Sequence, residues 1–395
     1  MDDPEALRFA FPDGRPATLL LGQASTVLSV GDTVVSSWDL AGRPYALVRE
    51  SGTYRRGLDG GLLHKREAGS EGPRLRRRLS ALEGETIVEA ARREAEAVLE
   101  HRPSLVGDRL RQVVAMDAGT LRADAARFLS VCGPVGLLPP DRYLSLVVRV
   151  TEGCSWNACT FCQLYRDVPF RSKAPDALRS HVDALREFFG ASIALRSSVF
   201  LGDANALCLP HGRLLPLLET VTAAFPGAPL YSFVDAWTGE RKTVAEWRDC
   251  ARLGLRRVYV GLETGDPGLL EWLGKPGGPE DAIALVRAVH QAGIAAGVIV
   301  LLGAGGERFA AAHAESTAAA LIAMRLGPGD FVYFSEYVDD PRLEYGRRAA
   351  GMPDLEPLTS GRCAELREAI LVFLGRDGAA CLPHVATYDI REFVY

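Results

Sequence analysis

The sequence predicts an α/β protein in which a parallel sheet follows a smaller α+β region. From Tyr143 onward, apolar runs of strand length alternate with amphipathic stretches of helix length, as in parallel sheets with helical crossovers. The preceding residues instead show short β-branched runs between turns, and then helices. The chain has 395 residues and is 48% hydrophobic, which is enough for two or three domains.

The N-terminal region, residues 1–135, is expected to form an accessory domain. Short strands are predicted at 18–21, 33–36 and 45–48, separated by turns that contain glycine. Residues 54–60 read as a surface hairpin or, alternatively, as a substrate loop. The basic run 74–78 reads as a solvated helix start or loop, with a polyanion contact as the alternative. Helices are predicted from about residue 79 and at 106–114 and 120–131, and prolines 134, 139 and 140 then mark a boundary.

The second region, residues 143–340, is expected to form the α/β core. Its predicted strands are 144–150, 197–201, 230–234, 257–261, 296–302 and 331–337. The helices between them are predicted at 174–189, 214–225, 244–253, 280–292 and 310–325. In parallel sheets ligands collect at the carboxyl ends of the strands, where the motifs below fall. Residues 341–395 are expected to form a helical extension with an aromatic tail, which is either a terminal strand or a segment over the mouth of the sheet.

Composition and charge limit the function classes. The net charge of −5 gives no footprint of a general nucleic-acid binder, so no nucleic-acid partner is expected. No apolar run reaches the ~20 residues that span a bilayer, and the acidic N-terminus resembles no signal peptide. Five of the eight cysteines are scattered, so we expect no disulfides and a reducing cytoplasmic location. A second cluster that uses Cys363 and Cys381 is a lesser alternative.

Three cysteines lie within nine residues, directly after the first predicted core strand. Four residues separate Cys154 from Cys159, and two separate Cys159 from Cys162. Thiolates this close on one loop can converge on a soft metal. A structural zinc site needs a fourth ligand nearby, but the next candidates are His181 and Cys208. The pattern therefore indicates an iron–sulfur cluster with one open iron position.

This segment resembles the cluster loop of radical SAM enzymes, which lies after the first strand of a partial (β/α)6 barrel. The C-x4-C-x2-C spacing is a variant of the family's commoner three-then-two spacing. The surrounding residues look like the branch that contains elongator-type, methylthiotransferase and HemN-like proteins. The resemblance implies that Cys154, Cys159 and Cys162 bind a [4Fe-4S] cluster whose open iron binds S-adenosylmethionine (SAM). A structural metal site and an inactive descendant are the alternatives.

The resemblance also assigns SAM contacts along the successive strands. Phe161, before the last cysteine, matches the residue that packs on the adenine. Gly202 and Asp203, at the end of the second strand, match the segment that receives the amino group of SAM. Ser232 or Asp235 on the third strand would bind a ribose hydroxyl, and Asp235 has a helix-capping turn as its alternative.

The fourth and fifth strands supply the remaining expected contacts. Glu263 lies between two glycines, and Lys275 follows it by twelve residues, as in the branch named above. The ammonium of Lys275 would meet the carboxylate of SAM, which is the expected charge match. Gly303 belongs to the strand-five segment that lines the adenine. No phosphate-loop or dinucleotide fingerprint follows these glycines.

The resemblance implies reductive cleavage of SAM to a 5′-deoxyadenosyl radical, which takes hydrogen from a substrate. A small-molecule substrate and an electron donor such as flavodoxin or ferredoxin are expected. Catalytic residues and the substrate itself cannot be read from the sequence. Two alternatives stay open, namely a non-catalytic redox sensor that binds a cluster and SAM, and a HemN-like cofactor carrier.

Overall fold

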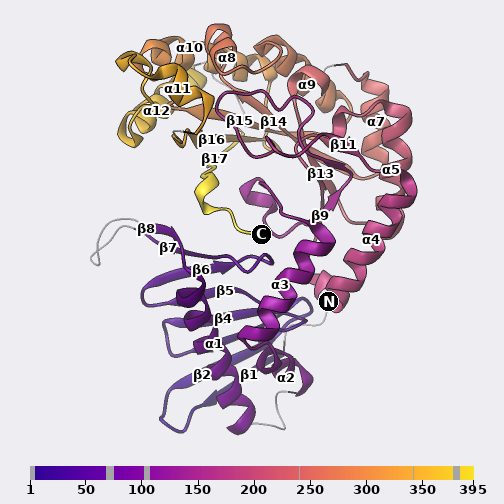
Figure 1. The fold of residues 1–395 in the computed structure, drawn as a ribbon, viewed down its shortest axis with the longest axis vertical. Helices are drawn as coiled ribbons and strands as arrows, with labels where there is room; N and C mark the ends of the chain where they lie inside the picture. The colour runs from indigo at the N-terminus through magenta and orange to yellow at the C-terminus, as the bar shows by residue number, and fades with distance from the viewer. Residues whose placement is uncertain (1–4, 68–74, 102–106, 240, 341, 377–382) are drawn as a thin grey trace. The chain divides into compact units, whose positions relative to one another are not determined.

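The computed structural model describes residues 5–67, 75–101, 107–239, 241–340, 342–376 and 383–395. Its contacts divide the chain into two units, whose elements Figure 1 labels. The first comprises Met1–Leu146, His181–Ser197 and Arg391–Tyr395, and the second comprises Val147–Ser180 and Ser198–Ile390. The three-part division at 1–135, 143–340 and 341–395 stays a prediction. The contact boundary falls just after the expected linker, and most of the expected C-terminal extension groups with the second unit.

The first unit is built on an eight-stranded antiparallel sheet whose strands follow one another in sequence order. The strands are β1 (Glu5–Ala10), β2 (Pro16–Leu21), β3 (Ser25–Val30), β4 (Val34–Asp39), β5 (Pro44–Arg49), β6 (Gly52–Arg56), β7 (Leu62–Arg66) and β8 (Leu75–Arg78). Three helices follow, α1 (Ala81–His101), α2 (Gly107–Ala115) and α3 (Ala118–Cys132). All three predicted helices of this region are therefore present.

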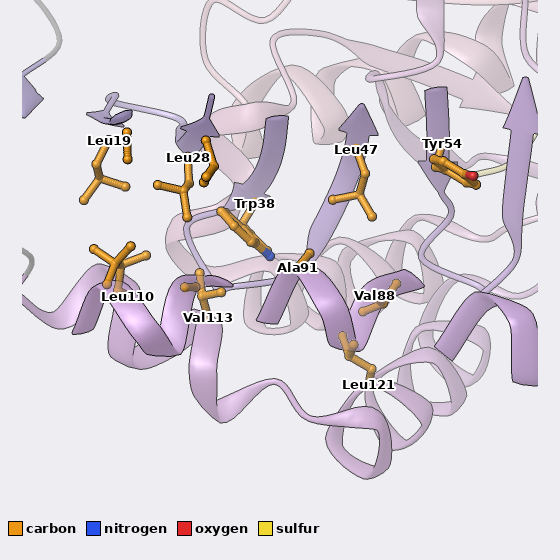
Figure 2. Packing of buried hydrophobic residues seen from close by; sticks show 14 of the residues in the cluster. Leu19, Leu28, Trp38, Leu47, Tyr54, Val88, Ala91, Leu110, Val113 and Leu121 are labelled. Carbon is orange, nitrogen blue, oxygen red and sulfur yellow. The ribbon is translucent and has the colours of Figure 1, made fainter. Parts of the chain in front are cut away.

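The core of this unit lies between the sheet and the helices. Burial alternates along β3, where Thr26, Leu28 and Val30 are buried and their neighbours are not, as expected for a sheet with one covered face. In Figure 2, Trp38 and Leu28 point from the sheet toward Val113 and Ala91 on the helices. Each such fully buried aliphatic side chain contributes roughly 1.5–3 kcal/mol of transfer free energy. Packing against the apolar face of the helices therefore stabilises this sheet.

Two local predictions in this unit need correction. Residues 75–78 of the basic run form the strand β8 and not a helix start or loop, because Leu63 to Arg66 of β7 pair with them. The segment 54–60 does belong to a hairpin, between β6 and β7, yet Tyr54 is buried and not at the surface. Tyr54 stacks on His64 with ring centroids 4.3 Å apart. In both segments, pairing with a neighbouring strand determines the structure.

The second unit is built on a seven-stranded sheet in the order β17-β16-β15-β14-β13-β12-β9. Its strands are β9 (Leu146–Arg149), β12 (Val199–Gly202), β13 (Leu230–Val234), β14 (Leu255–Glu263), β15 (Ala295–Leu302), β16 (Phe331–Glu336) and β17 (His384–Thr387). The pairs from β12 to β17 are parallel. The two end strands β9 and β17 are not neighbours in this order, so the sheet of the described residues is open. The predicted parallel α/β fold is thus confirmed.

The sequence predicted six of these seven strands. The seventh, β17, has the short sequence His-Val-Ala-Thr and pairs with β16, about fifty residues earlier in the chain. It lies in the segment expected to be an extension, just before the aromatic tail. The tail itself ends in Arg391–Tyr395, which belongs to the first unit. There the hydroxyl of Tyr395 donates to the carbonyl of Ser145 at 2.7 Å.

Helices join the parallel strands as predicted, within a few residues at each end. The longer ones are α4 (Pro175–Phe189), α5 (His211–Ala224), α7 (Val244–Arg252), α9 (Pro279–Gln291), α10 (Gly306–Met324) and α12 (Ser360–Arg376). The short ones are α6 (Ala236–Gly239), α8 (Pro267–Trp272) and α11 (Glu344–Ala349). None of the helices in the described part of the chain has the length and apolar character needed to cross a bilayer.

Candidate active site

The cysteine loop is closed at its base by a two-stranded ribbon. Strand β10 (Thr151–Glu152) pairs antiparallel with β11 (Arg171–Ser172), so residues 153–170 form one loop at the end of β9. Gly153 opens the loop with φ +74°, and a Cβ there would lie 2.5 Å from the carbonyl oxygen of Val168. Only glycine fits this close approach without strain. The loop therefore begins at a fixed point.

Asp203 holds the base of this loop. Its Oδ1 accepts a hydrogen bond from Arg149 Nε at 3.0 Å, and its Oδ2 accepts one from the backbone N–H of Gly153 at 3.1 Å. Burial raises the pKa of this carboxyl, while Arg149 opposes the shift. Asp203 was expected to receive the amino group of SAM. Both of its oxygens instead have partners within the chain, and its contact with SAM stays a proposal.

The three cysteines of the loop are free thiols and partly exposed. Burial raises the pKa of Cys159 to about 12; Lys275 lowers it, whereas Cys162, Glu263 and Cys154 raise it further. Burial also raises the pKa of Cys162, to which Cys154 adds. The charges of the three thiols and of the Glu263–Lys275 pair therefore influence one another. The N–H of Asn157 also points at Cys154 Sγ, at 3.4 Å.

The thiols fit an iron–sulfur cluster better than a single ion. No three His, Cys, Asp or Glu side chains among the described residues are arranged to hold one metal ion. A four-iron cluster binds each thiolate through a different iron, so its cysteines need not converge on one point. Three soft sulfur donors on one loop, with an N–H directed at one of them, match that requirement. Cys154, Cys159 and Cys162 would therefore hold the cluster and leave one iron open.

The middle of the cysteine loop is braced against the segment that carries Lys275. Trp156 Nε1 donates to the carbonyl of Gly274 at 2.8 Å. The N–H of Thr160 donates to the carbonyl of Leu273 at 2.8 Å, and its own carbonyl accepts from Tyr345 N at 3.0 Å. Thr160 is buried, although it lies between two cysteines. These bonds fix the distance between the thiols and Lys275.

The Glu263–Lys275 pair lies at the carboxyl end of β14. Lys275 Nζ donates to Glu263 Oε1 at 2.6 Å, and both side chains are largely buried. Burial alone would lower the pKa of Lys275, but Glu263, followed by Cys159, more than offsets it, and the pKa is raised. The ammonium is therefore charged and lies next to the thiols. Glu263 accepts only one of the three N–H donors of Lys275, so the others remain available to a ligand.

The backbone at this strand end is unusual. Glu263 has φ +59°, in the left-handed region that a residue with a side chain seldom adopts. The register of β14 against β15 shifts between Gly261 and Glu263. A Cβ at Gly261 would lie 2.3 Å from Glu263 Oε1 and 2.6 Å from Lys275 Nζ. Gly261 therefore leaves the space that the ion pair occupies. Such strain concentrates at functional sites.

A buried polar network supports the turn after Glu263. Thr264 Oγ1 lies 2.7 Å from His313 Nδ1 and accepts from the N–H of Asp266 at 3.0 Å. Thr317 Oγ1 accepts from the N–H of Gly265 at 2.9 Å. His313 is buried on α10, its Nε2 has no hydrogen-bond partner, and burial lowers its pKa to about 4. A neutral ring whose Nδ1 accepts from Thr264 fits these contacts.

A second polar group lies beside Cys154. Asp235 caps the short helix α6, where its Oδ1 accepts from the N–H of Thr238 at 2.7 Å. The amide Nδ2 of Asn205 contacts Asp235 Oδ2 and lies 3.4 Å from Ser155 Oγ. The Oδ1 of Asn205 is buried without a partner. The contacts of Asp235 thus match the helix cap that the sequence offered as the alternative to a ribose contact. Asn205 keeps one acceptor atom, Oδ1, that is not used.

The other expected SAM contacts lie as follows. Ser232 is fully buried, and its hydroxyl faces the carbonyls of Leu201 and Phe233 at 3.0 and 2.9 Å. Phe161 packs partly buried against a cluster that includes Leu273 and Tyr345. A Cβ at Gly303 would lie 2.8 Å from Cys363 Sγ, so that glycine packs against α12. Gly202 is the last residue of β12 and precedes Asp203. Their roles toward SAM stay proposals.

Sequence reasoning missed the residues that position the site. Arg149, Trp156, Thr160 and His313 were not singled out. Trp156 and Thr160 lie inside the cysteine motif, and that position in the sequence is the signal that could have identified them. Arg149 and His313 have partners about fifty residues away in the chain, which one sequence does not reveal. Cys381, the suggested partner of Cys363, lies outside the described residues.

Residues 148–312 match the sequence model of the radical SAM superfamily. This range contains the cysteine loop, the Glu263–Lys275 pair and the carboxyl ends of five strands. The chain therefore contains a region that matches the radical SAM superfamily. Members of this superfamily are enzymes that use a [4Fe-4S] cluster and SAM. The chain's place in the elongator-type, methylthiotransferase or HemN-like branch stays a prediction.

Individual relatives are distant. The 4'-phospho-dehydrooxetanocin synthase of Priestia megaterium is 26% identical over 168 residues, which cover 38% of this chain and 22% of that protein. This chain thus matches about a fifth of that relative's length. The solved structure of TsrM, a radical SAM methyltransferase from Kitasatospora setae with cobalamin and a [4Fe-4S] cluster bound, is 18% identical, covers 53% of this chain and 38% of its own, and has a TM-score of 0.40.

A second solved structure is coproporphyrinogen III oxidase (HemN) from Escherichia coli. It is 18% identical, the match covers 64% of this chain and 56% of HemN, and the TM-score is 0.43. The sequence identity and the TM-score are too low for either structure to indicate the substrate of this chain.

Proposed function

We propose that this radical SAM enzyme cleaves SAM reductively and removes a hydrogen atom from a small-molecule substrate. When bound, the cluster and SAM supply the chemistry: one electron breaks the S–C5′ bond, giving methionine and a 5′-deoxyadenosyl radical that becomes 5′-deoxyadenosine by taking the hydrogen. The observation that carries the proposal is the cysteine loop, braced beside the buried Glu263–Lys275 pair at the strand ends.

The chain's own residues then have distinct tasks. Cys154, Cys159 and Cys162 hold the cluster, and Asp203 with Arg149 fixes the base of their loop. The remaining donors of Lys275 are proposed to bind the carboxylate of SAM, as a charge-assisted hydrogen bond. Phe161, Gly202, Ser232 and Gly303 are proposed to line the rest of the SAM site. The electron is proposed to come from an external donor of the flavodoxin or ferredoxin type, in a reducing compartment.

The test is an anaerobic assay on the full chain. The cluster is reconstituted with iron and sulfide, dithionite and SAM are added, and 5′-deoxyadenosine is measured by mass spectrometry. We expect the wild type to form it and Cys159→Ala to lose both the cluster absorption and the product. Cys250→Ala is the matched control, since Cys250 is buried in α7 away from the loop.

Two outcomes would contradict the proposal. A fully loaded wild-type cluster that binds SAM but forms no 5′-deoxyadenosine with several reductants would favour the sensor or the HemN-like carrier. Product formation by Cys159→Ala at the wild-type rate would remove the assigned cluster site.

A further inference from the structure

A pocket of about 370 Å³ lies within the first unit, whereas the cysteine loop belongs to the second. Its walls come from α1, α3 and the turn between β6 and β7. All its lining residues lie between positions 56 and 129, so it belongs wholly to this unit. Its volume is within the range of pockets that bind small organic ligands, about 300–1,000 Å³.

The pocket exists because two helices face each other with small side chains. On α1, Ala81, Gly84 and Val88 recur at helical spacing, and on α3 the same holds for Ala118, Leu121 and Ala125. Figure 2 shows Val88 and Leu121 at this side of the core. Small residues on both helices leave space that larger side chains would fill. The interior of the pocket is therefore mostly apolar.

Three carboxylates line the pocket. Asp59 Oδ1 accepts from the N–H of Gly61 at 2.9 Å, and the other two carboxylates have cationic partners. Glu85 on α1 pairs with Arg122 on α3 at 2.5 Å. Glu89 pairs with Arg92 at 2.8 Å. Both pairs keep their charge balanced without a ligand.

Arg56 is the exception in the pocket wall. Its one hydrogen bond joins Nη2 to the carbonyl of Leu121 at 3.4 Å, which is long, and it makes no ion pair with any described residue. The nearby carboxylate of Asp124 is occupied at both oxygens by Arg43, at 2.7 and 2.9 Å. Burial lowers the pKa of Arg56, and Asp124 and Asp59 only partly oppose this. A half-buried guanidinium with spare donors can accept an anionic partner.

We propose that this pocket binds a small amphipathic carboxylate, with its apolar body between α1 and α3 and its carboxylate on Arg56. The guanidinium has a planar fork of donors that matches a carboxylate, which favours this head group over an alcohol. Gly60 lies beside that end: a Cβ there would be 4.0 Å from Arg56 Nη2 and 3.4 Å from Ala125 Cβ. The site requires neither the cluster nor SAM.

The test uses octanoate and 1-octanol as probes on the full chain without its cluster. Binding is followed by saturation-transfer NMR titration. A ten-atom acid in such a pocket should bind with a Kd of roughly 0.1–1 mM. We expect 1-octanol to bind about tenfold or more weakly, because a hydrogen bond to a charged group contributes ~1.5–3 kcal/mol, which is about 10–100-fold.

Two pairs of variants separate the two parts of the site. Arg56→Gln should bring octanoate down to the level of 1-octanol, whereas Arg127→Gln, an exposed arginine on α3, should not. Ala126→Leu should block both probes by filling the pocket, whereas Ala123→Leu, at a position of the same helix that does not line the pocket, should not. Thermal melts of each variant distinguish lost binding from lost folding.

Three results would overturn the proposal: no saturable octanoate binding by the wild type, equal affinity for the two probes, or full octanoate binding by folded Ala126→Leu.

Discussion

Two groups of buried charged side chains, one in each unit, differ in how many of their hydrogen-bond donors and acceptors are used. The comparison distinguishes an ion-pair network that only stabilises the fold from one that can bind a ligand. In the first unit, Arg43 is 4% exposed and uses every side of its guanidinium. It bonds Asp39, both oxygens of Asp124, Ser192 Oγ and the carbonyl of Phe188, and it lies over the ring of Phe188 at 4.5 Å. Nothing in this group is left for a ligand.

The group at the end of β14 is the opposite case. Lys275 has one acceptor for three donors, Glu263 adopts a left-handed backbone, and His313 Nε2 and Asn205 Oδ1 have no partners. Burial and shifted pKa values occur in both groups, so they do not by themselves mark a site. Unused hydrogen-bonding capacity and local strain separate the two. The following predictions test that contrast.

The largest effect is expected from Arg43→Met. Removing one partner leaves Asp39 and Asp124 buried without a counter-charge, which typically costs about 3–5 kcal/mol of unfolding free energy. Urea denaturation followed by circular dichroism measures it. Arg127→Met, which loses an exposed pair with Glu187 and a contact over the ring of Phe188, should reduce stability by at most about 1 kcal/mol. Equal effects of the two variants would show that the Arg43 network is not structural.

An intermediate loss of folding stability is expected when the pH is lowered and His313 becomes protonated. Its folded pKa of about 4 is below the unfolded value of 6.5, so between these pH values the unfolded chain binds the additional proton. Stability should therefore fall by about 2 kcal/mol as the pH drops from 7 to 5. His313→Gln removes the titrating group and should lose this part of the slope in urea denaturation at the two pH values. An unchanged slope in His313→Gln would contradict the assignment.

The last effect concerns ligand binding, and it is expected from Lys275→Gln. Loss of a charge-assisted hydrogen bond should weaken SAM binding about 10–100-fold, because such a bond contributes ~1.5–3 kcal/mol. Calorimetric titration of the anaerobic cluster-loaded protein measures it. Lys173→Gln, which breaks the 2.7 Å pair with Glu152 in the same unit, is the control and should leave SAM affinity unchanged. Wild-type SAM affinity in Lys275→Gln would remove Lys275 from the site.

The same contrast explains what the sequence revealed. Strand 230–234 and the alternation of strands and helices follow from local apolar runs, and so they were predicted well. The strands β8 and β17 were missed because cross-strand partners, and not their own residues, make them strands. The cysteines, Glu263 and Lys275 were visible as spacings within short motifs. Asp203 was visible too, but not its partner Arg149, because that contact depends on the folded sheet.

The double anchoring of Thr160 has a consequence for biogenesis. Its N–H is held by Leu273 and its carbonyl by Tyr345. At a synthesis rate of ~5–20 residues per second, Tyr345 leaves the ribosome's active centre about 10–40 s after Thr160 does. Leu273 and Gly274 are made before Tyr345, so the loop gains its contacts to them first and its contact to Tyr345 last. The brace on the cysteine loop is therefore complete only once Tyr345 has been made.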